Sequence, residues 1–380
     1  MLAPEEVLTL HQEIVSIPSL SGSEARLADY LEEWLRVRSP NGAPARRIAN
    51  TLLLTAGSGP IVLLDTHLDT VPPASGWTRD PFRPRLEDGR VYGLGANDAK
   101  ASVAAMIAAF LAVREERLPF TLALALVEAE ETRGTGTQAV LAELGKREEP
   151  LVAALLGEPT GLDVAAAQKG LLVLELLAKG EACHAAHAAA LGARNAAFAL
   201  AADLVALERL ELGPAHPRLG RVTVQPTVLR AGTARNVVPG EASAILDVRT
   251  VPGSHREVVD RLQAGLTAEV RVLSDRLVPR ETAEDEPVVR AALAARPEAR
   301  LYGSATLSDM VFMDGVPAVK CGPGRSERSH TPDEFVLEEE ILDGVKFYTD
   351  FVHAFAALTQ AEGGGAPSPL EGGRGRGFGG

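Results

Sequence analysis

The chain has 380 residues, of which 46% are hydrophobic and 23% are charged, and its formal net charge is −13. This composition is typical of a folded protein and excludes a disordered, collagen-like or coiled-coil chain. The acidic charge gives no general electrostatic reason to bind nucleic acid or anionic lipid. Two cysteines, Cys183 and Cys321, are too few for a disulfide scaffold or a cysteine-based zinc site. With no secretory signal pattern and no apolar run long enough to span a bilayer, we expect a cytoplasmic protein with no nucleic-acid or membrane partner.

The first part of the chain alternates helical patterns with buried strands. Helices are expected where apolar residues recur at helical spacing, and strands where short runs are almost purely apolar. The expected order is helix Val7–Ile17, helix Glu24–Val37, strand Ile61–Asp65, helix Ala99–Arg114, strand Phe120–Val127, helix Thr135–Leu144 and strand Leu151–Leu156. Strands separated by helices predict βαβ units, so the fold class is α/β with a mostly parallel sheet.

The pattern changes after about residue 170, where the strands become half-buried. The expected order there is strand Leu171–Lys179, helix Ala193–Arg209, strand Arg221–Leu229, strand Ala242–Arg249, helix His255–Leu266 and strand Ala268–Asp275. This βαββαβ order predicts a small α+β domain at 171–280, inserted into a catalytic domain formed by 1–170 and 281–359. The catalytic domain is completed by helix Val288–Ala295, strand Ala318–Lys320 and helix Glu338–Leu358. The glycine-rich residues 360–380 have too few apolar side chains to fold and are expected to be disordered.

Short polar motifs follow several of the predicted strands or precede a predicted helix. They are Asp65–Asp69 (DTHLD), Tyr92–Lys100 (YGLGANDAK), Glu128–Glu131 (EAEE), Gly157–Thr160 (GEPT) and Ser329–Glu334 (SHTPDE). Each has an ordinary structural explanation when taken alone; Asp98, for example, stands at the N-cap position of the helix that follows it. Because the carboxyl ends of parallel strands meet at one edge of a sheet, however, we expect these motifs to lie together.

Two imidazoles and three carboxylates would meet at this edge. They belong to His67, His330, Asp98, Glu131 and Glu158. Imidazole and carboxylate ligands in this number suit a pair of borderline cations such as zinc, with one carboxylate shared between them. Two such ions share a water whose pKa falls toward neutrality. The sequence therefore predicts a two-metal hydrolytic centre.

The joint pattern of HLD, GLGANDAK, EAEET, GEPT and SHTPDEF resembles the dinuclear zinc hydrolases that include acetylornithine deacetylase, succinyl-diaminopimelate desuccinylase, aminoacylase and carboxypeptidase G. The resemblance covers nearly the whole chain except the tail, and it implies a zinc-peptidase-like catalytic domain with an inserted lid and dimerisation domain. It also implies two Zn²⁺ per chain, for which Co²⁺ can substitute. In this resemblance Asp98 bridges the ions, His67 and Glu158 hold one of them, and Glu131 and His330 hold the other.

The same resemblance assigns roles to residues that are not metal ligands. Glu130 is implied to be the general base and acid, and Asp69 to orient His67. In the inserted domain, the segment GEACH ending at His184 resembles the family segment whose imidazole polarises the scissile carbonyl. His184 is nearest the end of the preceding strand, but the family's usual proline is missing here, so His187 is the alternative.

Four further residues match segments that the family uses near its substrate. Asn236 lies in GTARNVVP, Arg249 in DVR, Ser308 in LSD and Gly324 in GPGR. The resemblance implies that they help to bind the substrate. A guanidinium suits a carboxylate because it can bind both oxygens, although an ordinary strand-end charge is the alternative explanation for Arg249.

We therefore expect a metal-dependent amidohydrolase that acts on N-acyl amino acids as a homodimer. Segments 69–98, 304–309 and 320–324 look more like the acetylornithine deacetylase branch than the peptidase branches, and the acidic chain mildly favours a cationic side chain. N-acetylornithine, cleaved to ornithine and acetate in arginine biosynthesis, is thus the expected substrate. The alternatives within the family are a succinyl-diaminopimelate desuccinylase, an acetylcitrulline or acetyl-lysine deacetylase, and a dipeptidase or carboxypeptidase. A two-metal phosphoesterase would want more cationic groups, and a non-catalytic binding module would not be expected to keep Glu130 beside an intact ligand set.

Overall fold

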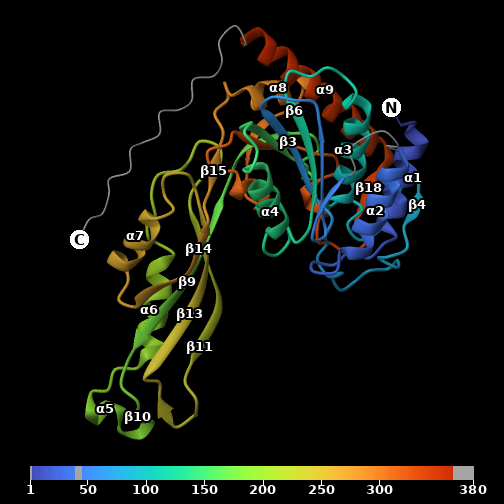
Figure 1. Cartoon of the computed structure of the whole chain (residues 1–380). Coiled ribbons are helices and arrows are strands. Elements are labelled where there is room, and N and C mark those ends of the chain that lie inside the picture. The colour runs from blue at the N-terminus through green and yellow to red at the C-terminus, as the bar shows by residue number, and fades with distance from the viewer. Residues whose placement is uncertain (1, 39–44, 363–380) are drawn as a thin grey trace.

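A computed structural model describes residues 2–38 and 45–362 of the chain. Figure 1 shows a larger part, here called the body, and a long inserted domain that projects from it. The inserted domain is residues 170–277, which contain a separate four-stranded sheet, and the body is formed by the described residues on either side. The predicted fold class, a mostly parallel α/β sheet with an inserted α+β domain, is confirmed.

A nine-stranded sheet forms the centre of the body. In spatial order its strands are β1 (Arg46–Ile48), β2 (Thr51–Ala56), β6 (Thr121–Val127), β3 (Ile61–His67), β7 (Leu151–Leu156), β17 (Ala318–Lys320), β8 (Val164–Gln168) and β15 (Arg280–Glu281), with β16 (Leu301–Ser304) paired to β8. The central strands β6, β3, β7 and β17 are parallel, whereas β1, β2 and β15 pair antiparallel at the edges. The residues that follow β6, β3 and β7 therefore emerge side by side at one edge of the sheet.

Helices cover both faces of this sheet because its central strands are apolar on both sides. In β3, Ile61 and Leu63 pack in one core with α4 (Thr135–Leu144), whereas Val62 and Leu64 pack in a second core with α3 (Lys100–Val113). Helix α3 is apolar all round and is buried between the sheet and α9 (Glu338–Glu362). The body also contains α1 (Pro4–Val15), α2 (Ala25–Arg38), α8 (Pro287–Ala295) and a small sheet of β4 (Arg85–Glu87), β5 (Arg90–Tyr92) and β18 (Phe335–Leu337).

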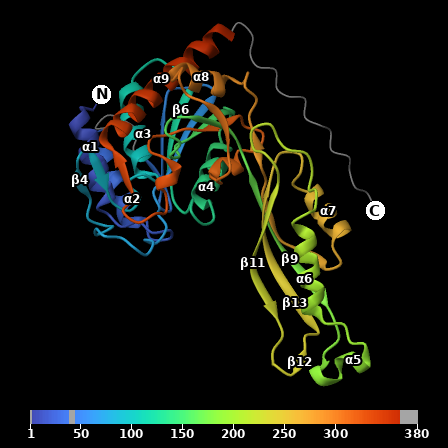
Figure 2. The ribbon, with the colours of Figure 1, turned by 180° about the vertical axis from the view of Figure 1, so that it is seen from behind.

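The inserted domain has its own hydrophobic core. Its antiparallel sheet has the order β11 (Thr223–Ala231), β13 (Glu241–Thr250), β9 (Gly170–Lys179) and β14 (Glu269–Leu277). Alternate residues of β9, such as Leu172 and Leu174, are buried against α6 (Ala196–Leu207) and α7 (Glu257–Gly265), which lie on the same face of the sheet (Figure 2). The end of the domain far from the body carries β10 (Cys183–His184), α5 (Ala188–Leu191) and β12 (Val237–Val238).

The structure corrects the sequence-based expectations at two helix ends. Helix α3 begins at Lys100 with Ala99 as its N-cap, so Asp98 does not cap the helix and its side chain is free for another contact. Helix α9 runs to Glu362, beyond the expected start of the tail at residue 360, and residues 363–380 lie outside the described residues. Within the described part of the chain, no single helix is long and apolar enough to cross a membrane, although the bent pair Ala185–Leu191 and Ala196–Leu207 together has the length and composition.

Candidate metal centre and active site

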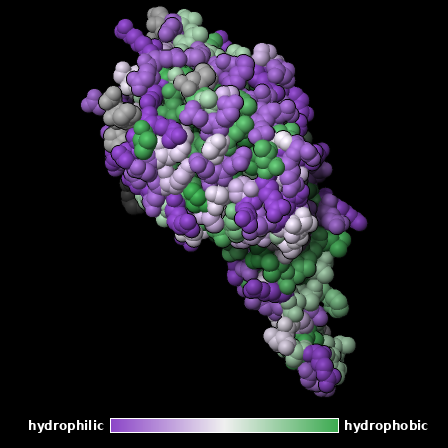
Figure 3. All heavy atoms as spheres, turned by 90° about the vertical axis from the view of Figure 1, so that its right-hand side faces the viewer, coloured by the Kyte–Doolittle hydropathy of each residue, from purple (hydrophilic) through white to green (hydrophobic). Residues whose placement is uncertain are grey.

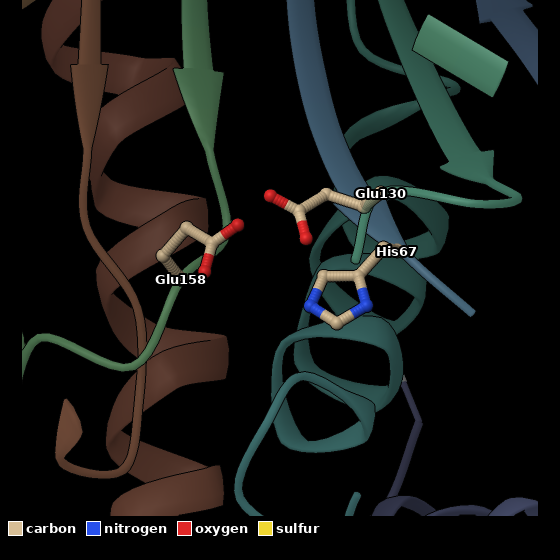
Figure 4. Close-up of side chains that lie close together, drawn as sticks. All are labelled: His67, Glu130 and Glu158. Atoms are coloured by element: carbon tan, nitrogen blue, oxygen red, sulfur yellow. The ribbon is translucent and has the colours of Figure 1, made fainter. Parts of the chain in front are cut away.

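The predicted polar motifs meet at one edge of the nine-stranded sheet. His67 is the last residue of β3, Glu130 and Glu131 follow the adjacent strand β6, and Glu158 follows β7 on the other side. Figure 4 shows the imidazole of His67 and the carboxylates of Glu130 and Glu158 pointing toward one another. Parallel pairing of the three strands thus brings together residues that are far apart in the sequence.

Two groups of side chains have the spacing of metal ligands. The first group is His67, Glu130 and Glu158, and the second is His67, Asp98 and Glu131. In each group the three possible ligand atoms, one from each side chain, all lie within 4.8 Å of one another. The Asp98 Oδ1 atom lies 3.1 Å from His67 Nε2, where the freed side chain extends from the loop before α3. Two members of this set also approach His330 Nε2, which lies 3.7 Å from Asp98 Oδ2 and 2.8 Å from Glu131 Oε1.

The ring of His67 is oriented for a ligand at Nε2. Its Nδ1 lies 2.9 Å from the main-chain oxygen of Asp69 and 3.5 Å from the carboxylate of the same residue. A proton on Nδ1 donated to that carbonyl leaves the Nε2 lone pair directed at the carboxylate cluster, as in metal-binding histidines. The main chain of Asp69 therefore has the shorter contact with the ring.

The carboxylate of Asp69 holds the loop that carries the two adjacent glutamates. Asp69 accepts hydrogen bonds from the main-chain N–H groups of Glu130 at 3.0 Å and Glu131 at 3.2 Å, and from the Ser21 hydroxyl at 2.7 Å. Burial opposes the ionisation of Asp69, but hydrogen bonds from His67, Ser21 and the Glu130 main chain outweigh it and lower the pKa. An ionised Asp69 thus fixes the position of both glutamates.

His330 reaches the cluster from the loop after a short 3₁₀ turn, Ser326–Arg328. Its Nε2 lies 2.8 Å from Glu131 Oε1, and this hydrogen bond is the main cause that raises the pKa of His330 to about 9. The imidazole is half-exposed at the mouth of the site, whereas His67 is buried. All five predicted metal ligands are therefore within one constellation.

The electrostatics of the constellation suit a cation. Burial raises the pKa of Glu158 to about 7 and raises that of Glu130 well above its ordinary value, and repulsion from Glu158 adds to the shift of Glu130. Several carboxylates removed from water without a positive charge between them are unfavourable, and a metal ion removes that penalty. Two imidazoles with carboxylate oxygens are also the donor set that zinc accepts. The residues present thus fit a two-metal centre.

A buried carboxylate that the sequence analysis quoted but did not interpret supports this centre. Glu334 accepts hydrogen bonds from the main-chain N–H groups of Gly95 at 3.0 Å and of Asn97 and Asp98 at 2.9 Å each. It therefore fixes the loop from which Asp98 extends. Its place in SHTPDEF, four residues after His330, was the available signal, but the sequence does not show which loop such a side chain reaches.

The predicted substrate-binding residues of the body lie beside the centre but not on its cavity. Gly324 has a φ of 79°, and a Cβ there would come within 2.3 Å of Asn97 Oδ1, so glycine permits the close approach of the two loops. Asn97 Oδ1 accepts a hydrogen bond from the Arg325 main chain at 2.8 Å. Ser308 is buried and donates to Gln168 Oε1 at 2.8 Å. In this conformation Gly324 and Ser308 therefore contribute to the packing of the segments around the centre.

The predicted residues of the inserted domain lie away from the centre. His184 and Asn236 are exposed at the far end of the domain, where β10 pairs with β12 and the Ala185 N–H donates to the Asn236 carbonyl. The ring centroid of His187, the alternative to His184, lies 5.6 Å from that of His184. Arg249, near the body, binds Asp247 through two hydrogen bonds of 2.8 and 3.1 Å. Parallel strands thus assemble the ligands, whereas nothing in this conformation brings these residues to them.

A cavity of about 740 Å³ opens on the metal centre. Asp98, Glu130, Glu131, Glu158 and His330 form part of its wall. The remainder of the wall includes Tyr302, Thr306, Lys320, Arg325 and Glu327. This volume is ample for a small-molecule substrate, and the mixture of charges on the wall suits a substrate that carries both signs.

Known proteins with related sequences are hydrolases by their names. A family model described as Peptidase family M20/M25/M40 matches residues 63–354, which include all the predicted metal ligands. A probable carboxypeptidase of Aspergillus terreus is 33% identical over 310 residues, which are 76% of this chain and 67% of that protein. The alignments with three further Aspergillus proteins described as probable carboxypeptidases span 61–63% of their lengths, so the chain covers about two thirds or less of these relatives. A putative LysW-lysine/LysW-ornithine hydrolase of Pyrobaculum aerophilum is 32% identical over 343 residues, 87% of this chain and 92% of that protein.

The fold also matches solved structures. A Bacillus subtilis protein described as a dinuclear metal-binding peptidase of the M20 family superimposes with a TM-score of 0.70, over 94% of this chain and 98% of that one. The sequence identity is 17%, so this match concerns the fold alone.

Proposed function

The chain belongs to peptidase family M20/M25/M40, and from this premise we propose that it is a two-metal amidohydrolase that removes the acyl group from N-acyl amino acids, N-acetylornithine first among them. The convergence of His67, Glu130 and Glu158 from three adjacent parallel strands carries the proposal. Such a centre is suited to hydrolysis because it can hold water, a carbonyl oxygen and a proton acceptor within one small space.

The proposed cofactors are two Zn²⁺ ions per chain, for which Co²⁺ can substitute. Asp98 would be shared between them, with His67 and Glu158 on one ion and Glu131 and His330 on the other. Metal ions bound there supply Lewis acidity, which acidifies water and polarises a carbonyl oxygen. The contacts of His67 with Asp98 and of His330 with Glu131 support this grouping.

Glu130 is the proposed proton carrier. Its carboxylate faces the cavity beside Glu158, and burial raises its pKa, so it holds a proton more readily than an ordinary glutamate. A group with such a pKa can accept a proton from the attacking water and donate it to the leaving amine. Asp69 fixes the backbone of Glu130 and thereby the direction in which the carboxylate points.

A second candidate is the release of lysine or ornithine from a larger acyl carrier. The Pyrobaculum relative named for LysW-lysine and LysW-ornithine aligns over 92% of its own length and 87% of this chain, which favours this candidate. Peptide hydrolysis from a carboxyl end is a third, named in the fungal relatives. All these reactions break an amide bond next to an amino acid with a free carboxylate, so they share the chemistry of the centre.

We also propose a homodimer that assembles through the inserted domain, in the cytoplasm. Figure 3 shows hydrophobic side chains gathered on the inserted domain next to the body. Large apolar side chains are also exposed on the two edge strands of the inserted domain's sheet, among them Val228, Leu229, Val272 and Leu273. An apolar surface at unpaired strand edges favours association with a second chain.

The test is a comparison of kcat/KM across N-acetylornithine, N-acetyl-lysine, N-acetylcitrulline, N-succinyl-diaminopimelate and simple dipeptides, with zinc or cobalt added. N-acetylornithine should be preferred by at least about tenfold, which corresponds to about 1.4 kcal/mol of transition-state stabilisation. Preference for a dipeptide or for the succinylated diacid would overturn the substrate assignment and leave the metal chemistry in place. A chain that hydrolyses none of these would overturn the small-molecule proposal in favour of a carrier-bound substrate.

A further inference from the structure

The cavity contains a buried lysine that the proposed mechanism does not use. Lys320 is the last residue of β17, which runs parallel to β7 with Lys320 opposite Leu156. Its side chain is buried, and it lines the same cavity as Glu130 and Glu158. Because Glu158 follows directly after β7, the neighbouring strand brings a positive charge to the edge of the metal centre.

The ammonium group of Lys320 is incompletely partnered. It donates to the main-chain oxygen and to the hydroxyl of Thr306, each at 3.1 Å. A lysine ammonium has three N–H donors, so one remains. Within the part of the chain that the structure describes, no carboxylate forms an ion pair with it.

The metal centre influences Lys320 only at longer range. Burial lowers the pKa of Lys320, and the charges of Glu158, Glu130 and Asp98 oppose that change and favour the charged form. Metal ions on these carboxylates would neutralise the charge that stabilises the ammonium. A buried ammonium with a spare donor and no counter-ion is unfavourable, and an anion in the cavity would remove this cost.

The other cations near the site are poorly placed to supply this contact. Arg249, the residue predicted to bind a carboxylate, has its guanidinium taken by Asp247 and does not line the cavity. Arg300 and Arg325 line the cavity, but their side chains are 82% and 64% exposed, so water screens their charges. Lys320 is the buried cation on this wall among the described residues.

We propose that Lys320 is a specificity-determining residue that binds the α-carboxylate of the amino acid to be released. The inference rests on the proposed function, in which the scissile amide lies at the metal centre. The α-carboxylate is separated from the amide nitrogen by a single carbon, so it lies close to the centre, as Lys320 does. Lys320 thus selects acyl amino acids with a free acid beside the amide bond.

The experiment compares each carboxylate substrate with its uncharged counterpart. N-acetylornithine and its α-carboxamide are assayed with the wild type, Lys320→Met, Lys320→Arg and the surface control Lys346→Met, all loaded with zinc. In Lys320→Met, kcat/KM for N-acetylornithine should fall about 10- to 100-fold, the range for a lost hydrogen bond to a charged group, mostly through KM. The carboxamide should lose less than about threefold, so the preference for the free acid should collapse. Lys320→Arg should keep part of the preference, and Lys346→Met all of it.

Equal losses for the acid and the carboxamide in Lys320→Met would overturn the inference, because a structural role for Lys320 affects both substrates alike. Zinc content and thermal unfolding of each variant are measured alongside. If Lys320→Met does not fold, Lys320→Gln replaces it, and full retention of the preference in that variant counts against the inference. If wild-type protein prefers another N-acyl amino acid, the pair is made from that compound and its carboxamide. A wild type that cleaves no N-acyl amino acid overturns the proposed function, and the inference with it.

Discussion

The body and the inserted domain present their candidate residues in opposite ways. In the body, His67, Glu130 and Glu158 extend from adjacent parallel strands, and main-chain hydrogen bonds to Asp69 fix the loop that carries Glu130. In the inserted domain, His184 is exposed on a two-residue strand at the end far from the body (Figure 1). The body is therefore organised before any ligand arrives, whereas His184 needs a movement or a second subunit to meet a substrate.

This contrast separates two kinds of experiment. Changes in the body should alter metal affinity or the rate at the centre itself, because each group has a fixed place there. Changes in the inserted domain should depend on how chains assemble and move. The contrast would fail if variants of the two regions behaved alike. Four predictions test it: three for the body, in order of decreasing effect, and then one for the inserted domain.

Removal of metal should have the largest effect. Chelation should abolish activity, and zinc or cobalt at about two ions per chain should restore it. Metal binding should stabilise the body by about 2.7 kcal/mol at a metal concentration 100 times Kd. Metal affinity should fall as the pH drops below about 7, because burial then keeps a proton on Glu158 and raises its pKa to about 7. Activity and hydrogen exchange with and without zinc check this. Full activity without transition metal, or protection of β11 rather than the ends of β3, β6 and β7, would contradict it.

Glu130→Gln should lower the rate by about 10²–10⁴-fold, the usual contribution of a general acid and base. The variant should keep its metals, because Glu130 is counted outside the ligand set. Kinetics and metal analysis of Glu130→Gln are compared with those of Glu131→Gln, which should lose metal affinity. The comparison is needed because either glutamate lies close enough to His67 to be a ligand. Loss of metal in Glu130→Gln alone would reverse the two roles.

The sequence allowed the central part of the site to be predicted because strand ends carry it. The apolar runs of β3, β6 and β7 are unambiguous, and parallel strands leave little freedom in where their following residues meet. The predicted start of the helix at Ala99 placed Asp98 at its N-cap position, which was wrong. The N-cap is Ala99, and the Asp98 side chain lies against His67 instead. A one-residue shift in a helix start is below what periodicity resolves.

Contacts between loops could not be predicted in this way. Glu334 reaches the main chain before α3, and Lys320 reaches Thr306, along paths that depend on how loops fold over one another. Short strands such as β10 and β12 are too brief to show a period. The placement of His184 relative to the centre depends on how the inserted domain sits against the body, which no local pattern encodes.

Glu334→Gln should have the smallest effect of the three changes in the body. An amide nitrogen in place of one carboxylate oxygen would face the N–H groups of Gly95, Asn97 or Asp98 and leave at least one of them unpaired. Because this loop carries Asp98, metal affinity should fall by about 10- to 100-fold, as for other groups that orient metal ligands. Zinc titration measures it, with the exposed Glu339→Gln as the matched control. Unchanged affinity in Glu334→Gln would show that the loop holds its position without this carboxylate.

The fourth prediction concerns how His184 meets the substrate, and it tests the inserted domain directly. His184→Ala alone should lose about 10²–10³-fold in rate, the usual cost of removing a group that stabilises an oxyanion. Exposure of His184 far from the centre of its own chain favours delivery to the centre of a second chain. If His184 acts on a second chain, two inactive variants can complement each other in one dimer. If His184 instead moves to the centre of its own chain, they cannot.

Two inactive variants should then restore one another. In a dimer of His184→Ala with Glu130→Gln, the first chain has an intact Glu130 and receives His184 from its partner, so one of the two sites is complete. With free exchange half of the dimers are mixed, so about a quarter of wild-type activity should return. The measurement is the rate after denaturation and joint refolding, with exchange verified by a mass tag on one chain. No recovery in verified mixed dimers would show that His184 acts within its own chain. The role would pass to His187 if His187→Ala alone were inactive and recovered in the same mixture, while His184→Ala kept full activity. Each of these outcomes leaves the proposed metal centre of the body unchanged, because all of its residues belong to one chain.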